Sequence, residues 1–121
     1  MPNVFKLKSH KAMPSASSSN DIETLYTVPH ATATTTIVLG LILCNIHTSQ
    51  VNVSVKLHST TSDSETNEDV WLLHNVPVPA GSSLELLSGG KVVMKSNDYL
   101  QIKSSTDATI DAALSIMEQT A

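Results

Sequence analysis

The longest unbroken apolar stretch of the chain spans residues 37–44 and reads Ile-Val-Leu-Gly-Leu-Ile-Leu-Cys. Three threonines precede it and Asn45 follows it, so its length and its β-branched lead-in predict a buried strand rather than a helix. Side chains of a strand point alternately to the two faces of a sheet, and an unbroken apolar run therefore indicates that both faces are covered. A core covers only one of them. We expect the other face to be covered by more of the chain or by another subunit.

Shorter patterns predict further strands, either by strict alternation of apolar and polar side chains or as brief apolar segments between turn residues. These segments are residues 22–28, 51–58, 84–87, 91–94, 99–103 and 110–117. The last of them has a competing interpretation, because Ala, Leu, Met and Glu also favour a helix over residues 108–117.

The connections support an antiparallel arrangement. Residues 76–81 contain two prolines, which predicts an extended connector outside the sheet that ends in a turn at Ala80-Gly81. Ser88-Gly89-Gly90 predicts a tight hairpin between the strands on either side of it. About eight strands and no convincing helix indicate an all-β fold, a single antiparallel β-sandwich or jelly-roll-like domain over residues 21–121.

Residues 70–74 form a second strand that is apolar on both faces. Trp71 stands among leucines there, a setting that favours burial over a role in stacking on a sugar. Together with the first stretch, this strand gives the side chains that we expect at an interface between subunits. They are Ile37, Leu39, Leu41, Leu43, Trp71 and Leu73.

Residues 1–20 read as an extended N-terminal arm that ends in a Ser-rich linker. The arm holds three of the seven lysines and no acidic residue, whereas residues 21–121 hold four lysines and all eleven acidic residues. A solvated terminus is one interpretation. The other is a basic arm with apolar anchors that docks on an acidic neighbouring subunit. The residues that would make this contact are Val4, Phe5, Lys6, Leu7, Lys8 and Lys11.

Composition excludes several classes of function. The chain has no arginine and a net charge of −4, which is unsuited to a phosphate backbone, so we expect no nucleic-acid partner. The apolar run is far shorter than the roughly 20 residues that cross a bilayer, and no signal-peptide core follows the N-terminal lysines, so we expect no membrane partner and synthesis in a cytoplasm. The single cysteine, Cys44, excludes an intrachain disulfide and a cysteine zinc site, and we expect it to be a small buried side chain.

Candidate chemistry is sparse. The five histidines are scattered, and we expect His58 and His74 at solvent-facing or interface positions. No nucleophile elbow or phosphate-binding glycine loop occurs. Acidic and amide residues alternate between Asp63 and Asp69, but the turn glycine and late glutamate of a calcium loop are missing. We therefore predict no enzyme, no catalytic residue, no metal site and no cofactor.

Residues 23–29 read Glu-Thr-Leu-Tyr-Thr-Val-Pro, and residues 75–87 join Asn-Val-Pro-Val-Pro-Ala-Gly to a Leu-Glu-Leu-Leu strand. Residues 97–103 read Asn-Asp-Tyr-Leu-Gln-Ile-Lys and are taken together with residues 114–118, Leu-Ser-Ile-Met-Glu. These three passages resemble a group of small structural proteins of tailed bacteriophages, particularly contractile-tailed phages of cyanobacteria and other marine hosts, in which Gly-Asp stands in place of Asn97-Asp98. The resemblance implies a non-enzymatic virion protein, made in the host cytoplasm and assembled in several copies with other virion proteins.

Residue patterns and resemblance lead to one main hypothesis: a head decoration or cement, neck or tail accessory protein that forms a homo-oligomer, with its arm docked on neighbouring subunits. The alternative is a carbohydrate-binding sandwich module, such as part of an adhesin or receptor-binding tip, in which Trp71, Tyr26 and Tyr99 offer stacking faces. The exposure of Trp71 and the oligomeric state distinguish these two hypotheses.

Overall fold

The structure is a computed structural model that describes residues 3–13, 22–29, 34–59, 67–87, 91–106 and 108–120. All the regular elements within these ranges are strands, which confirms the all-β prediction. The strands are β1 (Asn3–Met13), β2 (Ile22–Thr27), β3 (Thr34–Asn45), β4 (Val51–His58), β5 (Val70–Val78), β6 (Ser83–Leu86), β7 (Val92–Met94), β8 (Tyr99–Ser104) and β9 (Ile110–Thr120). None of the described segments is a helix that could span a membrane.

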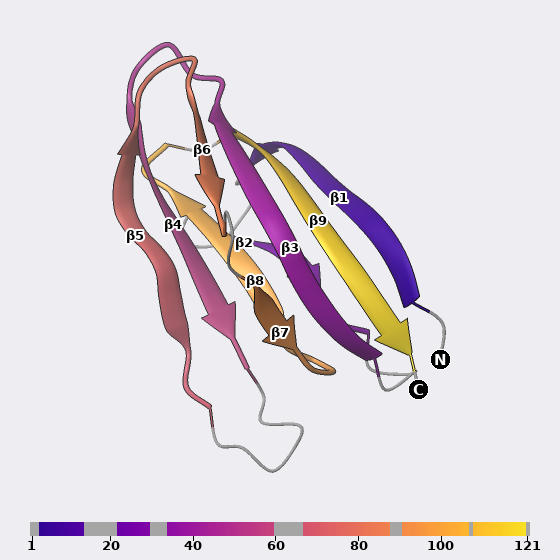
Figure 1. The fold of residues 1–121 in the computed structure, drawn as a ribbon. Coiled ribbons are helices and arrows are strands. Elements are labelled where there is room, and N and C mark those ends of the chain that lie inside the picture. The colour runs from indigo at the N-terminus through magenta and orange to yellow at the C-terminus, as the bar shows by residue number, and fades with distance from the viewer. Residues whose placement is uncertain are drawn as a thin grey trace.

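The strands form two antiparallel sheets that pack face to face (Figure 1). Sheet A has the order β1-β9-β3-β6, with β7 also paired to β3, and sheet B has the order β2-β8-β4-β5. Except at β4-β5 and β6-β7, each connection crosses from one sheet to the other, and the first and last strands lie side by side in sheet A. This is the arrangement of a jelly roll, in which distant parts of the sequence become neighbours.

The core between the sheets is almost wholly aliphatic. Val53 and Val55 of β4 belong to this core together with Leu114 and Ile116 of β9, and all four are at most 1% exposed. They occupy the inward positions of alternating strands, as the sequence pattern predicts for residues 51–58 and 110–117. Residues 110–120 are a strand between β1 and β3, so the helical alternative for this segment is wrong.

The predicted connector at residues 76–81 begins later than the sequence suggests. β5 continues through Pro77 to Val78 and pairs with Asn52 and Val51 of β4. Proline is tolerated here because β5 is the edge strand of sheet B, where one side of the backbone has no ladder to join. The turn at Ala80-Gly81 is confirmed, and Gly81 has a φ of 73°, which suits a residue without a Cβ.

β6 and β7 do not form the predicted hairpin. Both pair antiparallel with β3, β6 along Leu41–Cys44 and β7 along Thr36–Val38, so the two short strands follow one another along the same edge. This arrangement places Leu84 and Leu86 opposite the core residues Leu43 and Leu41. A hairpin would give the second strand a different neighbour and remove it from β3. Residues 88–90, where the turn was expected, lie outside the described residues.

The segment predicted as an N-terminal arm is extended and forms β1 at the edge of sheet A in this chain. It pairs along its length with β9, from Asn3 opposite Gln119 to Met13 opposite Ile110. Met13 is 1% exposed and is the residue by which β1 reaches the core. The boundary expected after residue 20 lies outside the described residues.

Candidate functional site

The outer face of sheet A, which points away from the core, carries a band of apolar side chains. Phe5 is 72% exposed, Leu7 66%, Ile42 48% and Val93 60%. The register places them on one face. Phe5 and Leu7 lie opposite Met117 and Ser115 of β9, which alternate with the core residues of that strand, and Val93 lies opposite Ile37. We call this set the apolar outer face; its members are Phe5, Leu7, Ile37, Leu39, Ile42, Val93 and Met117.

A β-bulge decides which residues of β3 belong to this face. The pairing of β3 with β9 shifts between Val38 and Gly40, so Leu39 is an extra residue in the strand. A bulge of this kind interrupts the alternation of side chains. Leu41 and Leu43, which strict alternation groups with Ile37 and Leu39 as interface residues, are core residues instead, 1% and 0% exposed.

After the bulge, the residues of β3 that face outward are Ile42 and Cys44. Before it, Ile37 and Leu39 are half-buried. Ile42 was not predicted to face outward, because nothing in an unbroken apolar run marks where its alternation breaks. Gly40 was the available signal, since an isolated glycine within a strand is a common sign of a bulge.

The apolar outer face has a hollow at one end. A depression of about 430 Å³ is lined mainly by Ser9 and Lys11 of β1, Ile42 and Cys44 of β3, and Ala113 of β9. The small side chains of Ser9 and Ala113, directly opposite one another, form its floor. Cys44 is a free, half-buried thiol at this position rather than a core residue.

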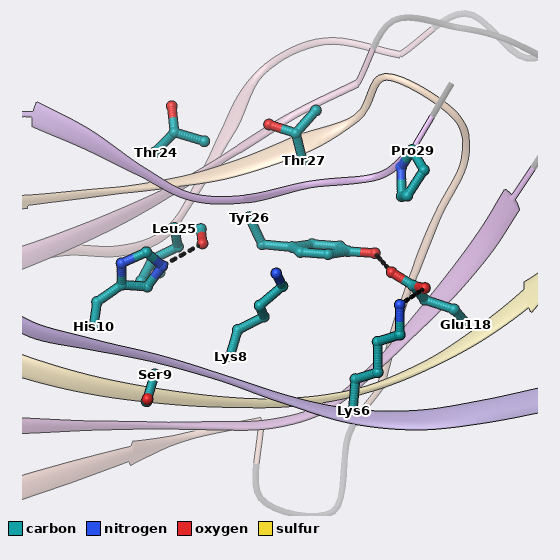
Figure 2. A pocket seen from close by; sticks show the side chains of 10 residues that line it. All are labelled: Lys6, Lys8, Ser9, His10, Thr24, Leu25, Tyr26, Thr27, Pro29 and Glu118. Atoms are coloured by element: carbon teal, nitrogen blue, oxygen red, sulfur yellow. Dashed lines mark hydrogen bonds and ion pairs between the residues drawn. The ribbon is translucent and has the colours of Figure 1, made fainter. Parts of the chain in front are cut away.

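A second, polar hollow of about 480 Å³ lies on the other side of β1, between the edge strands of the two sheets (Figure 2). Lys6, Lys8 and His10 point into it from β1, and Tyr26 points into it from β2. The His10 ring Nε2 lies 2.8 Å from the backbone oxygen of Leu25 and joins the two edges. The predicted arm residues thus divide between two faces: Lys6 and Lys8 turn toward this polar hollow, whereas Phe5 and Leu7 turn outward and Lys11 lines the hollow of the outer face.

Glu118 is the acidic centre of this hollow. Lys6 Nζ lies 2.8 Å from one carboxylate oxygen, and the hydroxyl of Tyr26 donates to the other at 2.5 Å. The same hydroxyl lies 2.8 Å from Thr36 Oγ1. Three strands, β1, β2 and β9, therefore meet at one carboxylate that is 8% exposed.

The pKa values of Tyr26 and Glu118 are shifted by burial and by these contacts. Burial raises the pKa of Tyr26 well above its ordinary value, and the hydrogen bond to Glu118 raises it further. Burial also pushes up the pKa of Glu118, but the hydrogen bonds from Lys6 and Tyr26 and the charges of Lys6 and Lys8 outweigh it, so the pKa is lowered overall. Glu118 is thus a carboxylate and Tyr26 a neutral donor at neutral pH.

Trp71 and Leu73, the two remaining residues predicted at an interface, lie on β5 of sheet B. Their side chains are on opposite faces of the sheet. Leu73 is half-buried and packs against the core, whereas Trp71 is 44% exposed. The ring of Trp71 is 5.2 Å from that of His74, and Lys56 Nζ lies 5.9 Å from its centroid. Trp71 is not buried within this chain, although its leucine neighbours favour burial, because its position opposite Lys56 is on the outer face of sheet B.

Polar groups near Trp71 form a small surface cluster. His58 stacks on Tyr99 at 4.3 Å, and its Nδ1 lies 2.6 Å from Asp69 Oδ1. Lys56 approaches the same carboxylate at 3.4 Å. Within the described ranges, no group of three or more His, Cys, Asp and Glu side chains is arranged to hold a metal ion. Asp63 and Glu65 of the acidic loop lie outside the described residues.

Comparisons with known proteins point to the fold. No protein-family model matches the sequence, and no curated protein matches it either. A chain of the T13 IBDV viral particle has a TM-score of 0.57 at 12% identity, over 96% of this chain and 30% of that one. A chain of infectious bursal disease virus, Gx strain, has a TM-score of 0.55 at 12% identity, over 95% of this chain and 33% of that one.

A chain of the Bacillus endospore appendages, described as disulfide-linked pili, matches more weakly, with a TM-score of 0.44 at 13% identity over 98% of this chain and 85% of that one. This chain spans about a third of the two viral chains. At these identities the similarity is one of fold, and the two viral matches cover nearly the whole of this jelly roll.

Proposed function

We propose that this protein is a non-enzymatic structural subunit of a bacteriophage virion, a head decoration, neck or tail accessory component, that assembles as a homo-oligomer. The observation that carries the proposal is the apolar outer face of sheet A. Four large apolar side chains on one face are between 48% and 72% exposed, and contiguous apolar surface of this kind is rare on a monomer unless it is a binding site.

The fold supports the same proposal. Jelly rolls are common in viral capsids, and the two viral-particle chains share this fold along nearly all of its length. The resemblance of residues 22–118 to small phage structural proteins supplies the choice of a tailed phage. Assembly with other virion proteins, after synthesis in the host cytoplasm, belongs to the proposal.

Docking of the N-terminal segment on neighbouring subunits is the second part of the proposal. β1 is joined to the body chiefly along one edge of β9, and its basic side chains meet a body that holds all eleven acidic residues. β9 of a neighbouring subunit has the same backbone groups for β1 to pair with, the same Glu118 for Lys6 to contact and the same core position for Met13. Exchange of an identical element between copies needs no new contact and is a low-cost route to an assembly.

Single-cysteine variants test whether β1 docks on a neighbour. Asn3 lies opposite Gln119 in the ladder, at a Cα separation suited to a disulfide. With Cys44→Ser in every chain, we expect co-assembled Asn3→Cys and Gln119→Cys chains to form a disulfide-linked pair. Asn3→Cys and Gln119→Cys within one chain provide the control for geometry. If the control closes and the mixed chains stay unlinked, β1 remains in its own subunit and this part of the proposal is contradicted.

Glycan binding is a second candidate, favoured by the exposure of Trp71 beside His74 and Lys56. An exposed indole with polar neighbours is a stacking face that sugars use. Tryptophan fluorescence during titration with a panel of glycans distinguishes the two candidates, because Trp71 is the only tryptophan of the chain. A saturable change in a monomeric protein would favour the binding module over the structural subunit.

A further inference from the structure

We infer that the apolar outer face of sheet A binds the same face of a second copy, around a two-fold axis that crosses the strands at Leu7 and Ser115. The inference rests on the proposed assembly and names the surface through which two copies meet. Its central observation is that this face carries a projection and a hollow at matching positions.

The projection is Phe5. Its side chain is 72% exposed, the largest value among the large apolar residues. It lies opposite Met117 at one end of the apolar outer face, and Leu7, two residues further along β1, is 66% exposed. Aromatic side chains that protrude in this way are typical anchors of an interface, because one ring buries a large apolar area with little loss of conformational freedom.

The hollow is the 430 Å³ depression over Ser9 and Ala113. Ser9 is as far from Leu7 along β1 as Phe5 is, two residues or about 7 Å in the opposite direction. A two-fold axis through Leu7 and Ser115, parallel to the sheet and perpendicular to its strands, therefore places Phe5 of each copy over the hollow of the other. Both contacts form together, as an isologous interface requires.

The residues on the axis allow the two sheets to approach. Leu7, Ser115 and Gly40 lie side by side across β1, β9 and β3. Two of these three side chains are small, and Gly40 has no heavy atom within 4 Å of the position that a Cβ would take. The axis places β9 of one copy over β9 of the other, where Ser115 and the neighbouring Gly40 leave room for the two sheets to come close.

Charge is confined to the edges of this face. Lys11 and Asp111 lie at the far end of the hollow, where the Ala12 backbone N–H donates to Asp111 Oδ1 at 2.8 Å, and Glu85 lies on the edge strand β6. Among the described residues, the rows between Phe5 and Ile42 carry no charged side chain on this face. Charged residues are depleted at the core of interfaces in the same way, because they would have to be desolvated.

The area is sufficient for a stable pair. β1, β9 and β3 are 11, 11 and 12 residues long, and β6 with β7 completes a fourth row. At about 3.4 Å per residue and about 4.8 Å between strands, the face covers roughly 700 Å². Pairing two copies would bury roughly twice that area, which lies within the usual range for specific interfaces.

Cysteine cross-linking at the axis tests the inference with the full chain. In a Cys44→Ser background, Leu7→Cys places two thiols across the axis at about the spacing of packed sheets, roughly 10 Å, within reach of a short bis-maleimide. Asn52→Cys, exposed on sheet B, is the control. We expect covalent dimers from Leu7→Cys and monomers from Asn52→Cys.

A pair of substitutions tests the anchor. Phe5→Ser should raise the dimer dissociation constant roughly tenfold or more. Val4→Ser is the matched control: Val4 is also an exposed apolar residue of β1, but it lies opposite Glu118 and points to the other face. Circular dichroism confirms that each variant is folded.

The outcomes separate this inference from the proposed function. If the protein is oligomeric but Leu7→Cys does not cross-link, or if Phe5→Ser and Val4→Ser weaken assembly equally, the subunits meet through another surface and the inference is overturned. If the unmodified chain stays monomeric at every concentration, the proposed structural function fails with it.

Discussion

Glu118, in the last strand β9, shows how one residue connects the end of the sequence to the first two strands, β1 and β2. Its carboxylate is held by Lys6 from β1 and by Tyr26 from β2, which also contacts Thr36 of β3. A buried carboxylate is costly unless it is paired and hydrogen-bonded, and here both conditions are met. The network therefore closes the side of the sandwich where the edge strands β1 and β2 adjoin (Figure 2).

Tyr26→Phe tests this network and its pH dependence. Removal of the hydroxyl leaves one carboxylate oxygen without its donor, so we expect a loss of about 1–2 kcal/mol in the free energy of unfolding at pH 7. The pKa of Glu118 is lowered in the folded state, so the stability it contributes is present above its ordinary value of 4.5 and is lost as the pH falls through the folded-state pKa.

The variant should therefore differ most from the parent above about pH 5, and the two should converge in acid. Urea unfolding at a series of pH values measures this difference. Tyr99→Phe, which alters a tyrosine outside the Glu118 network, is the control. A difference between parent and Tyr26→Phe that is the same at pH 3 and pH 7 would contradict the role assigned to Glu118.

Asn97 shows how one residue type favours a turn. Its φ is 74°, a left-handed conformation that asparagine tolerates better than most residues. The turn predicted at residues 96–98 from Ser-Asn-Asp is confirmed.

The β-bulge at Leu39 is the feature of β3 that determines the candidate interface. Val38 and Leu41 are both core residues although three positions apart, and only an extra residue between them allows this. Without the bulge, either the residues before it or those after it would turn to the wrong face, because a shift of one residue inverts every side chain of a strand.

Single-residue deletions in β3 test this assignment. Deletion of Leu39 restores simple alternation and leaves Val38, Leu41, Leu43 and Asn45 facing inward, so we expect a folded protein with a modestly lower melting temperature. Deletion of Ile42, the matched control, turns Leu43 outward and should prevent folding. Circular dichroism and thermal unfolding compare the two, and equal loss of structure in both would show that Leu39 is not an extra residue.

The strands were predictable from local pattern, whereas their partners were not. The alternation of apolar and polar residues predicted both ends of β4 and the presence of β9, because the inward positions of both strands are consistently apolar. The sequence did not reveal that β6 and β7 share one neighbour or that Pro77 lies on an edge strand, because both facts depend on sheet order. The outer face was foreseen from the excess of apolar residues in β3, but its members Phe5, Ile42 and Val93 come together only through pairing in space.

At the scale of the whole molecule, both faces of sheet A carry apolar side chains, but they differ in what covers them. The inner face is covered by sheet B, and the outer face has no covering within the described residues of this chain (Figure 1). Burial of apolar surface is the main favourable contribution to association, at about 25 cal/mol per Å² before the cost of association is subtracted. The second copy proposed to cover this face would account for the apolar side chains on both sides of β3.

Sedimentation equilibrium of the intact protein over a wide range of concentrations is the most direct measurement of this account. We predict a mass that is a multiple of the 12.9 kDa chain and that falls toward one chain only on dilution. A single 12.9 kDa species that persists at high concentration, with the outer face of sheet A still open to solvent, would contradict it.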